Sequence, residues 1–213
     1  MTMASGSFSF KQFTIDQDRC IFKVGTDGVM LGAYADVSGI KSILDIGTGS
    51  GLIALMLAQR SEAEITAIEP DLNSFEQACS NIRQSKWPQR IKVINTDLQN
   101  FRAEPEKFDL IISNPPYFID SLKNPDPGKA AARHNVTLKS ADLLRGISEL
   151  LTDQGRAQVI MPYAEGSILI AEANEFGLYC NDLLKIKPLP ASEVRRLIIT
   201  FSRKRNKTTE KVL

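Results

Sequence analysis

The sequence has little of the residues that bind metals or crosslink secreted proteins. Its 213 residues include one histidine and three cysteines, and the cysteines stand far apart at Cys20, Cys79 and Cys180. Their number is odd and their spacing is not that of metal ligands. We therefore expect reduced thiols, no metal site, and a reducing compartment such as the cytoplasm.

Long apolar runs are also missing. No stretch approaches the ~20 apolar residues that a membrane-spanning helix needs. The start, MTMASGSFSF, has no basic region followed by an apolar core. These absences predict a cytoplasmic protein with no membrane partner, and we expect a monomer.

Strong net charge is absent as well, since the formal total is only +1. The distribution is uneven, however. Residues 1–110 carry 11 basic and 14 acidic side chains, whereas residues 111–213 carry 15 and 11. A polyanion that contacts the C-terminal half would suit this asymmetry, and solvated surface charge explains it nearly as well.

What the sequence does contain is an alternation of short apolar strands with helical segments. We expect strands at residues 42–46, 64–69, 91–94, 108–113, 156–161, 178–187 and 194–202. Because most are separated by a helical segment, they predict an α/β fold with a seven-stranded, mostly parallel sheet and helices on both faces. The last two read as an antiparallel pair.

The domain prediction is simple. Residues 1–6 are expected to be disordered, and residues 7–213 to form one domain. Within it, residues 7–40 give a β-hairpin and a helix, residues 41–202 the core, and residues 203–213 a frayed basic tail.

The sequence also predicts turns and helix caps. The hairpin should have an apolar face and a turn near residues 16–18, and Thr26 or Asp27 should cap the first helix. Asp71 should cap a helix whose buried stripe is Phe75, Ala78, Cys79 and Ile82.

The segment FDLIISNPPY, residues 108–117, organises the rest of the chain. Its first half is typical of a strand that is buried on both faces. Two prolines then end the strand, because neither can donate to a sheet ladder. Asn114 and the carbonyl of Pro115 are thereby presented at the carboxyl end of a strand, where ligands bind in open α/β sheets.

Three more strand ends carry polar residues. Asp45 precedes the turn GTGSG, in which Gly47, Thr48, Gly49 and Gly51 would let the backbone approach a nucleoside. Glu69 ends the next strand, 24 residues after Asp45, close to the ~20-residue interval at which an acid meets a ribose, and Pro70 follows it. Asp97 and Leu98 follow the third. Each residue alone could be a helix cap or a surface charge, but four placements in order indicate one nucleoside site.

NPPY, residues 114–117, resembles the signature of S-adenosylmethionine-dependent amino-methyltransferases, which act on adenine N6 or on a protein glutamine amide. The resemblance implies a Rossmann-like class I methyltransferase fold with S-adenosylmethionine as the cofactor. It also implies that Asn114 and Pro115 hold the substrate nitrogen, that Tyr117 stacks on a flipped-out base, and that Asp97 accepts from the cofactor's adenine with Leu98 against the ring.

The run FKVGTDGVMLG, residues 22–32, and the AARHN that follows NPPY resemble a group of small bacterial tRNA adenine methyltransferases. That group acts on the adenine beside the anticodon of a valine tRNA. By this resemblance Lys23, Thr26 and Asp27 lie near the cofactor or the base. Residues 118–137 show no periodic hydrophobic pattern, and we predict that they form a lid that contacts the substrate. Within it, Phe118, Arg133 and His134 are candidate substrate contacts.

Two other hypotheses remain open at this point. The protein could methylate a glutamine amide of a release factor, although only 41 residues precede Ser42, too few for the helical domain that such enzymes usually carry. It could also be a module that binds S-adenosylmethionine without catalysis. The intact Asn114 and Tyr117 favour an enzyme, because a binding module has no use for them.

Overall fold

The structure is a computed structural model, and it describes residues 6–102, 107–116 and 138–213. In this part of the chain eight strands form the main sheet, in the order β10-β8-β9-β7-β6-β3-β4-β5. Their bounds are β3 (Ser42–Ile46), β4 (Glu64–Ile68), β5 (Ile91–Ile94), β6 (Phe108–Ser113), β7 (Leu151–Pro162), β8 (Tyr179–Ile186), β9 (Arg196–Ser202) and β10 (Thr209–Val212). Only β9 runs antiparallel to its neighbours. The α/β prediction is confirmed.

The strand count is corrected from seven to eight by the C-terminal segment. β10 pairs in parallel with β8, with Thr209 opposite Asp182. Earlier in the same tail, the guanidinium of Arg203 donates to the carbonyls of Ser148 and Leu151 at the end of a helix. The prediction of a frayed tail is therefore wrong, because the tail provides the hydrogen-bond partners that the edge of β8 would otherwise lack. The expected core boundary at residue 202 cuts through the sheet, and a single domain over residues 7–213 stays a prediction.

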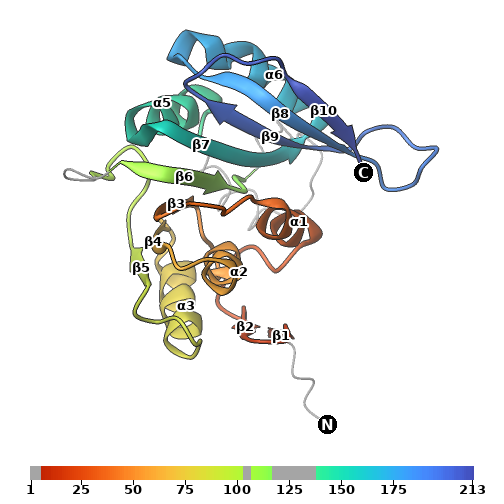
Figure 1. The fold of residues 1–213 in the computed structure, drawn as a ribbon. Coiled ribbons are helices and arrows are strands. Elements are labelled where there is room, and N and C mark those ends of the chain that lie inside the picture. Colours follow the sequence, from red (N-terminus) through yellow and green to blue (C-terminus); the bar gives the residue numbers. More distant parts are fainter. Residues whose placement is uncertain (1–5, 103–106, 117–137) are drawn as a thin grey trace.

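Helices cover both faces of the sheet (Figure 1). α1 (Thr26–Tyr34), α2 (Leu52–Arg60) and α3 (Leu72–Arg83) pack on one face, and α5 (Ser140–Leu150) and α6 (Tyr163–Ala173) on the other. Successive side chains of a strand point to opposite faces of the sheet. Ile43 belongs to the apolar cluster under α1–α3, and Leu44 belongs to the cluster under α5 and α6. A short 3-10 helix, η1 (Asn174–Phe176), follows α6 and ends at Gly177, whose φ is 68°.

The N-terminal hairpin is present, but its turn lies earlier than expected. Its strands are β1 (Ser7–Ser9) and β2 (Thr14–Asp16), so the turn between them is at residues 10–13, and Asp16 ends the second strand. The expected disorder at residues 1–6 lies outside the described residues except at Gly6, whose carbonyl accepts from the Gln17 N–H at 2.7 Å. The hairpin docks on α3, where the Asn81 side chain bonds both to the N–H and to the carbonyl of Asp16.

This docking corrects the buried stripe predicted for α3. Its buried positions include polar side chains as well as apolar ones, and they are Ser74, Gln77, Ala78, Asn81 and Ile82. Phe75 and Cys79 are only half-buried. The polar residues are buried because the preceding hairpin and loop cover them and supply hydrogen bonds, which a 3.6-residue apolar pattern does not reveal.

One predicted helix cap is confirmed and the other is wrong. The Asp71 carboxylate accepts from the Ser74 N–H at 2.8 Å and caps α3. α1 instead begins after Gly25, which has no side chain with which to cap it. Thr26 and Asp27 lie inside the first turn of α1, and the Asp27 carboxylate bonds to a residue outside this helix.

Candidate functional site

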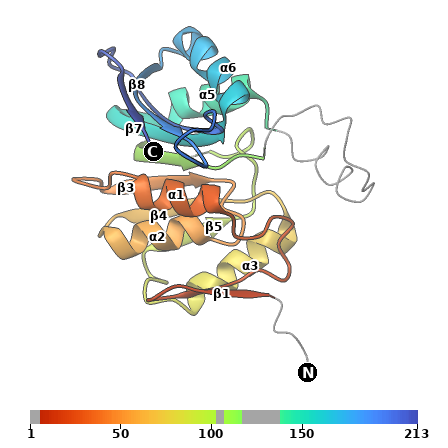
Figure 2. The same cartoon turned by 90° about the vertical axis from the view of Figure 1, so that its right-hand side faces the viewer.

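Three of the predicted site residues directly follow one hydrogen-bonded row of the sheet. Ile94, Ile68, Ile46 and Ser113 stand side by side on β5, β4, β3 and β6. The next residues along the chain are Asn95, Glu69, Gly47 and Asn114. Adjacent strands are ~4.8 Å apart, so the register alone brings these residues together at the carboxyl edge. Figure 2 turns this edge toward the viewer.

The glycine turn after β3 leaves open space above its backbone. Gly47, Gly49 and Gly51 have φ values of 71°, 59° and 84°, a region that disfavours other residues. A Cβ placed on Gly47 or Gly49 would meet no atom within 4 Å. The N–H groups of Gly47 and Thr48 both donate to the Ile68 carbonyl, which fixes the turn to β4. The turn therefore has free space above it, and its predicted contact with a nucleoside stays a prediction.

Asp45 is fully buried at the end of β3, beneath this turn. Its Oδ2 accepts from the Thr48 hydroxyl at 2.6 Å, and its Oδ1 has no hydrogen-bond partner among the described residues. Burial raises the pKa of Asp45 to about 7, against the lowering effects of Thr48 and of the Ala54 N–H. An unsatisfied buried carboxyl oxygen indicates a position where a donor is still to be supplied. Thr48 thus orients the Asp45 carboxylate, and its role in the site is to position Asp45.

Glu69 joins the glycine turn to the start of α3. Its Oε2 accepts from the Gly49 N–H at 2.8 Å, and its Oε1 from the Asp71 N–H at 3.0 Å. Burial raises the pKa of Glu69, and these two N–H groups lower it. Each carboxylate oxygen retains a further acceptor position. Glu69 therefore holds the glycine turn to the start of α3. Its predicted contact with ribose hydroxyls stays a prediction.

The residues that follow Glu69 and strand β5 make their observed contacts within the protein. The carbonyls of Glu69 and Pro70 accept from the Asn95 amide at 2.8 and 3.2 Å. Both oxygens of Asp97 bond to Asn100, one to its N–H and one to its side-chain amide. Leu98 is buried in the cluster under α5. The predicted contacts of Asp97 and Leu98 with a cofactor adenine stay predictions.

The end of β6 is fixed to the end of β3 by a side-chain bond. The Ser113 hydroxyl donates to the Ile46 carbonyl at 2.9 Å, and Ser113 is fully buried. Asn114 is half-buried and Pro115 is buried. A Cβ placed on Gly28 of α1 would lie 3.7 Å from Asn114 Nδ2 and 3.2 Å from Leu52 Cδ2. The first turn of α1 thus approaches the Asn114 amide closely at Gly28.

The three candidates from the first part of the chain differ in position. The Lys23 ammonium donates to the Gln17 carbonyl, and both Lys23 and Thr26 are exposed. Asp27 Oδ2 accepts from Arg196 Nε at 2.8 Å. Their predicted roles near the cofactor are untested. Four other candidates, Tyr117, Phe118, Arg133 and His134, lie outside the described residues.

Sequence reasoning missed three residues that the structure brings to this edge, namely Gly28, Ser113 and Arg196. Gly28 lies in the FKVGTDG run, so its position beside two other glycines was the available signal. Ser113 directly precedes Asn114. Arg196 is 169 residues from its partner Asp27, and no sequence pattern connects the two.

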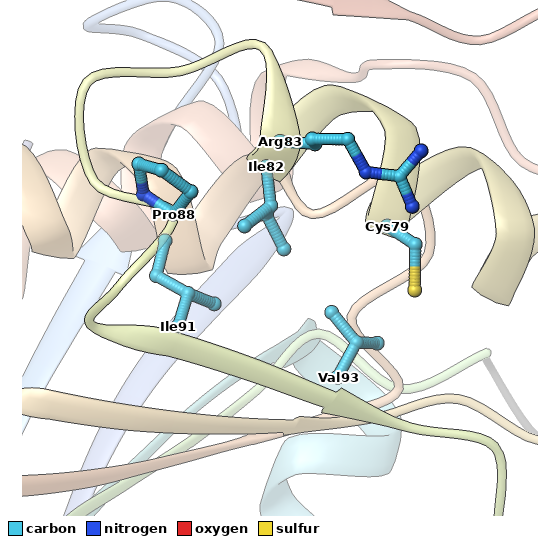
Figure 3. Close-up of a pocket in the computed structure, with 6 residues that line it drawn as sticks. All are labelled: Cys79, Ile82, Arg83, Pro88, Ile91 and Val93. Carbon is cyan, nitrogen blue, oxygen red and sulfur yellow. The ribbon is translucent and has the colours of Figure 1, made fainter.

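A surface pocket lies apart from these residues, between α3 and β5 (Figure 3). Its volume is about 220 Å³, and it is lined by Cys79, Ile82, Arg83, Pro88, Ile91 and Val93. None of the predicted site residues lines it. In the described ranges no helix is long and apolar enough to cross a membrane, and no group of three or more His, Cys, Asp or Glu side chains could hold a metal ion.

Comparison with known proteins assigns the chain to a family. The methyltransferase small domain model matches residues 30–152. A relative in Trichodesmium erythraeum, named tRNA1(Val) (adenine(37)-N6)-methyltransferase, is 46% identical over 207 residues, covering 95% of this chain and 87% of its own. A relative of the same name in Bacteroides thetaiotaomicron is 46% identical over 202 residues, with coverages of 94% and 85%.

Solved structures agree in fold. A methyltransferase from Pyrococcus furiosus superposes with a TM-score of 0.63 at 22% identity, covering 89% of each chain. M. jannaschii TYW2, solved in complex with AdoMet, gives 0.62 at 17% identity, covering 93% of this chain and 86% of its own. These likenesses support the Rossmann-like class I fold. The chain belongs to the methyltransferase small domain family, among relatives named tRNA1(Val) (adenine(37)-N6)-methyltransferase.

Proposed function

We propose that this protein transfers a methyl group from S-adenosylmethionine to the exocyclic N6 of an adenine in tRNA, at position 37 of a valine tRNA. The observation that carries the proposal is the placement of Asn114-Pro115 one strand away from the glycine turn, in line with Glu69. Relatives that carry this activity in their names match 93–99% of the chain at 43–46% identity. The site and the family therefore agree.

The residues present fit the cofactor. Open space lies above Gly47 and Gly49, Asp45 Oδ1 lacks a donor among the described residues, and Glu69 has acceptor capacity left. Asp45 and the turn amides would hold the amino-acid end, and Glu69 the ribose hydroxyls. When bound, S-adenosylmethionine supplies an electrophilic methyl on a sulfonium. Asp97 and Leu98 are the proposed adenine contacts, and Lys23, Thr26 and Asp27 the proposed neighbours of its methionine end or of the base.

Asn114 and Pro115 address the weakness of the nucleophile. The lone pair of an aromatic amine is conjugated with the ring, so the nitrogen reacts poorly. The Asn114 Oδ1 and the Pro115 carbonyl would accept both N–H groups, favour a pyramidal nitrogen and aim its lone pair at the methyl. The N–C bond would form as the bond between the methyl and the sulfonium sulfur breaks, and the N6 proton would then leave for solvent. Alignment of the two reactants can contribute ~7–11 kcal/mol, so no metal and no general base is required of this chain.

The substrate must leave its stack before N6 can reach this edge. We propose that Tyr117 stacks on the extruded base and that Phe118, Arg133 and His134 contact the RNA. Base stacking on an aromatic ring is worth ~1–3 kcal/mol per base. We also propose that the protein is a monomer that acts in the cytoplasm without a metal or a membrane partner.

The test is methyl transfer from labelled S-adenosylmethionine to total tRNA from a strain that lacks this protein. Nucleoside digestion and mass spectrometry then identify the product, and purified valine tRNA identifies the acceptor. The proposal expects N6-methyladenosine at position 37. Label in protein glutamine would overturn the substrate class, and cofactor binding without transfer to either acceptor would overturn the enzyme itself.

A further inference from the structure

A second pocket lies near the start of β7, away from the candidate methyl-transfer site. Its volume is about 270 Å³, and all of its lining side chains are polar or charged except for one glycine. The lining residues are Asp153, Gln154, Gly155, Arg156, Asn181, Thr200, Ser202, Lys204 and Asn206. None of the predicted site residues lines it.

The pocket lies on the face of the sheet that α1 covers, beyond the end of this helix. Thr200 and Ser202 point to the same face as Ile198, which belongs to the apolar cluster under α1–α3. The carbonyl of Asp36, two residues after α1, accepts from Arg156 at 2.7 Å. The apolar cover of this face therefore ends here, and a polar hollow takes its place.

The tail that follows β9 is fixed at this hollow by Asn181 of β8. Asn181 Nδ2 donates to the Lys204 carbonyl at 2.8 Å and to the Ser202 hydroxyl at 2.6 Å. Its Oδ1 accepts from the Asn206 N–H at 3.0 Å. The tail residues that line the pocket are thus held by the sheet itself.

Several lining side chains have donor capacity left. The Gln158 amide, which is only 3% exposed, donates to Thr200 Oγ1 at 3.2 Å. The Thr200 hydroxyl proton is then available, and no acceptor for it lies among the described residues. Arg156 uses Nε and Nη2 on the segment after α1, and Nη1 has no partner within the described ranges. Lys204 Nζ donates to Gln154 Oε1 and carries further N–H groups.

The charges around the pocket favour an anion. The Asp153 carboxylate is 3.8 Å from Arg203 Nε, and the Asp36 carboxylate is 3.1 Å from Arg156 Nη2. Lys204 bonds to a neutral amide and forms no ion pair in the part of the chain that the structure describes. One unneutralised cation beside several N–H and O–H donors suits a group with several acceptor oxygens and a negative charge, which is the chemistry of a phosphate.

We propose that this pocket binds a phosphate group, carried by the backbone of tRNA or by a free nucleotide. Lys204 and Arg156 donate to the phosphate oxygens, and so does the Thr200 hydroxyl. Gln158 orients that hydroxyl and is a positioning residue. The site goes beyond the proposed methyl transfer and uses none of its residues. Only the tRNA backbone as the source of the phosphate rests on the proposed function.

The first arm of the test measures binding of purified valine tRNA at several salt concentrations. Lys204→Gln should make the salt dependence shallower by about one unit, because one phosphate is no longer neutralised. Thr200→Val keeps the shape of the side chain and removes the hydroxyl, so it should raise the dissociation constant by ~10-fold at fixed salt. Thr200→Ser returns the hydroxyl and should recover binding.

The second arm measures binding of ribose 5-phosphate by isothermal titration calorimetry. This probe carries a phosphate monoester and no adenine, so it does not compete for the proposed cofactor site. If a free nucleotide is the source, the wild-type protein binds the probe, and Lys204→Gln and Thr200→Val each weaken binding by ~10-fold. Melting temperatures show that each variant folds.

The matched control is Lys92→Gln, an exposed lysine of β5 at the opposite edge of the sheet from β8 and β10. It should change neither arm. An equal change of the tRNA salt dependence in this control would reduce the effect to general surface charge and overturn the proposal. Unchanged binding of both ligands in Lys204→Gln and Thr200→Val would overturn it as well.

Failure of this proposal and failure of the proposed function are distinguishable, because both arms measure binding and neither measures methyl transfer. A wild-type protein that binds no tRNA contradicts the proposed function, and the ribose 5-phosphate arm then decides on the pocket by itself. A protein that methylates tRNA while both arms are unaffected by the substitutions overturns the pocket alone.

Discussion

The backbone N–H of Gly49 donates to Oε2 of Glu69 at 2.8 Å, so the acid expected to contact a ribose also holds the turn beneath it. The other oxygen, Oε1, accepts from Asp71 at the start of α3. One carboxylate therefore links two loops that follow different strands. Its loss should affect both the contact to the cofactor and the shape of the loop.

Glu69→Ala should weaken cofactor binding more than it slows transfer at saturation. A hydrogen bond to a charged group contributes ~1.5–3 kcal/mol, which corresponds to about a 10- to 100-fold rise in the dissociation constant for S-adenosylmethionine. Isothermal titration calorimetry measures this dissociation constant. Glu76→Ala, an exposed glutamate of α3, is the control and should bind normally. An unchanged constant for Glu69→Ala would remove this residue from the site.

Asn114→Ala should remove turnover and spare the cofactor. Loss of one aligned polar group at a reacting centre costs ~100- to 1,000-fold in kcat, and the glycine turn is untouched by the change. Single-turnover transfer and calorimetry measure the two effects. Asn174→Ala, at the far end of α6, should behave like wild type. Retained activity in Asn114→Ala would show that the two-acceptor scheme is wrong.

Stability of the unliganded protein should fall as the pH rises toward 7. Burial raises the pKa of Asp45 from its usual 3.8 to about 7. Between these values the folded protein binds more protons at this site than the unfolded chain, so the free energy of unfolding decreases with pH, by at most ~1.4 kcal/mol per unit. Urea unfolding from pH 4 to pH 8 measures the slope, and Asp45→Asn should flatten it. Equal slopes in both proteins would refute the raised pKa.

Arg203→Ala should destabilise the fold and leave the site intact. Its guanidinium donates to the Ser148 and Leu151 carbonyls at the end of α5, and the substitution removes these bonds. The expected loss is ~1–3 kcal/mol in the free energy of unfolding. The control is Arg205→Ala, two residues on, whose guanidinium lies over the Tyr179 ring at 5.9 Å and should cost less. Equal losses would contradict a specific role for Arg203.

The basic tail, residues 203–213, belongs to the C-terminal half that the charge asymmetry predicts for contact with a polyanion such as tRNA. It follows β9, whose last residue, Ser202, stands opposite Arg156 of β7, whereas Asn114 follows the carboxyl end of β6. Its contribution to tRNA binding stays a prediction. Neutralising Lys204, Arg205 and Lys207 together, with binding measured at two salt concentrations, tests it without removing β10. The salt dependence should become shallower by about one unit for each phosphate that the variant no longer neutralises.

The sequence by itself determined seven strands of the sheet and the order of the site residues along the chain. Apolar runs that end at Asp45-Ile46, Ile68-Glu69 and Ser113-Asn114 mark parallel strands and their carboxyl ends, because burial on both faces requires such runs. The glycine turn and the proline stop are local backbone effects, so residue identity alone specifies them. This is why the main cofactor candidates stand along one row.

Only the tertiary structure decided what contacts these residues. The Asp27–Arg196 pair, the approach of Gly28 to Asn114, and the polar docking face of α3 join segments that are distant in sequence. Strand β10 was missed because its residues, TEKV, are exposed and lack an apolar pattern. It forms because the edge of β8 offers unpaired backbone groups, and such an edge exists only once the sheet is assembled.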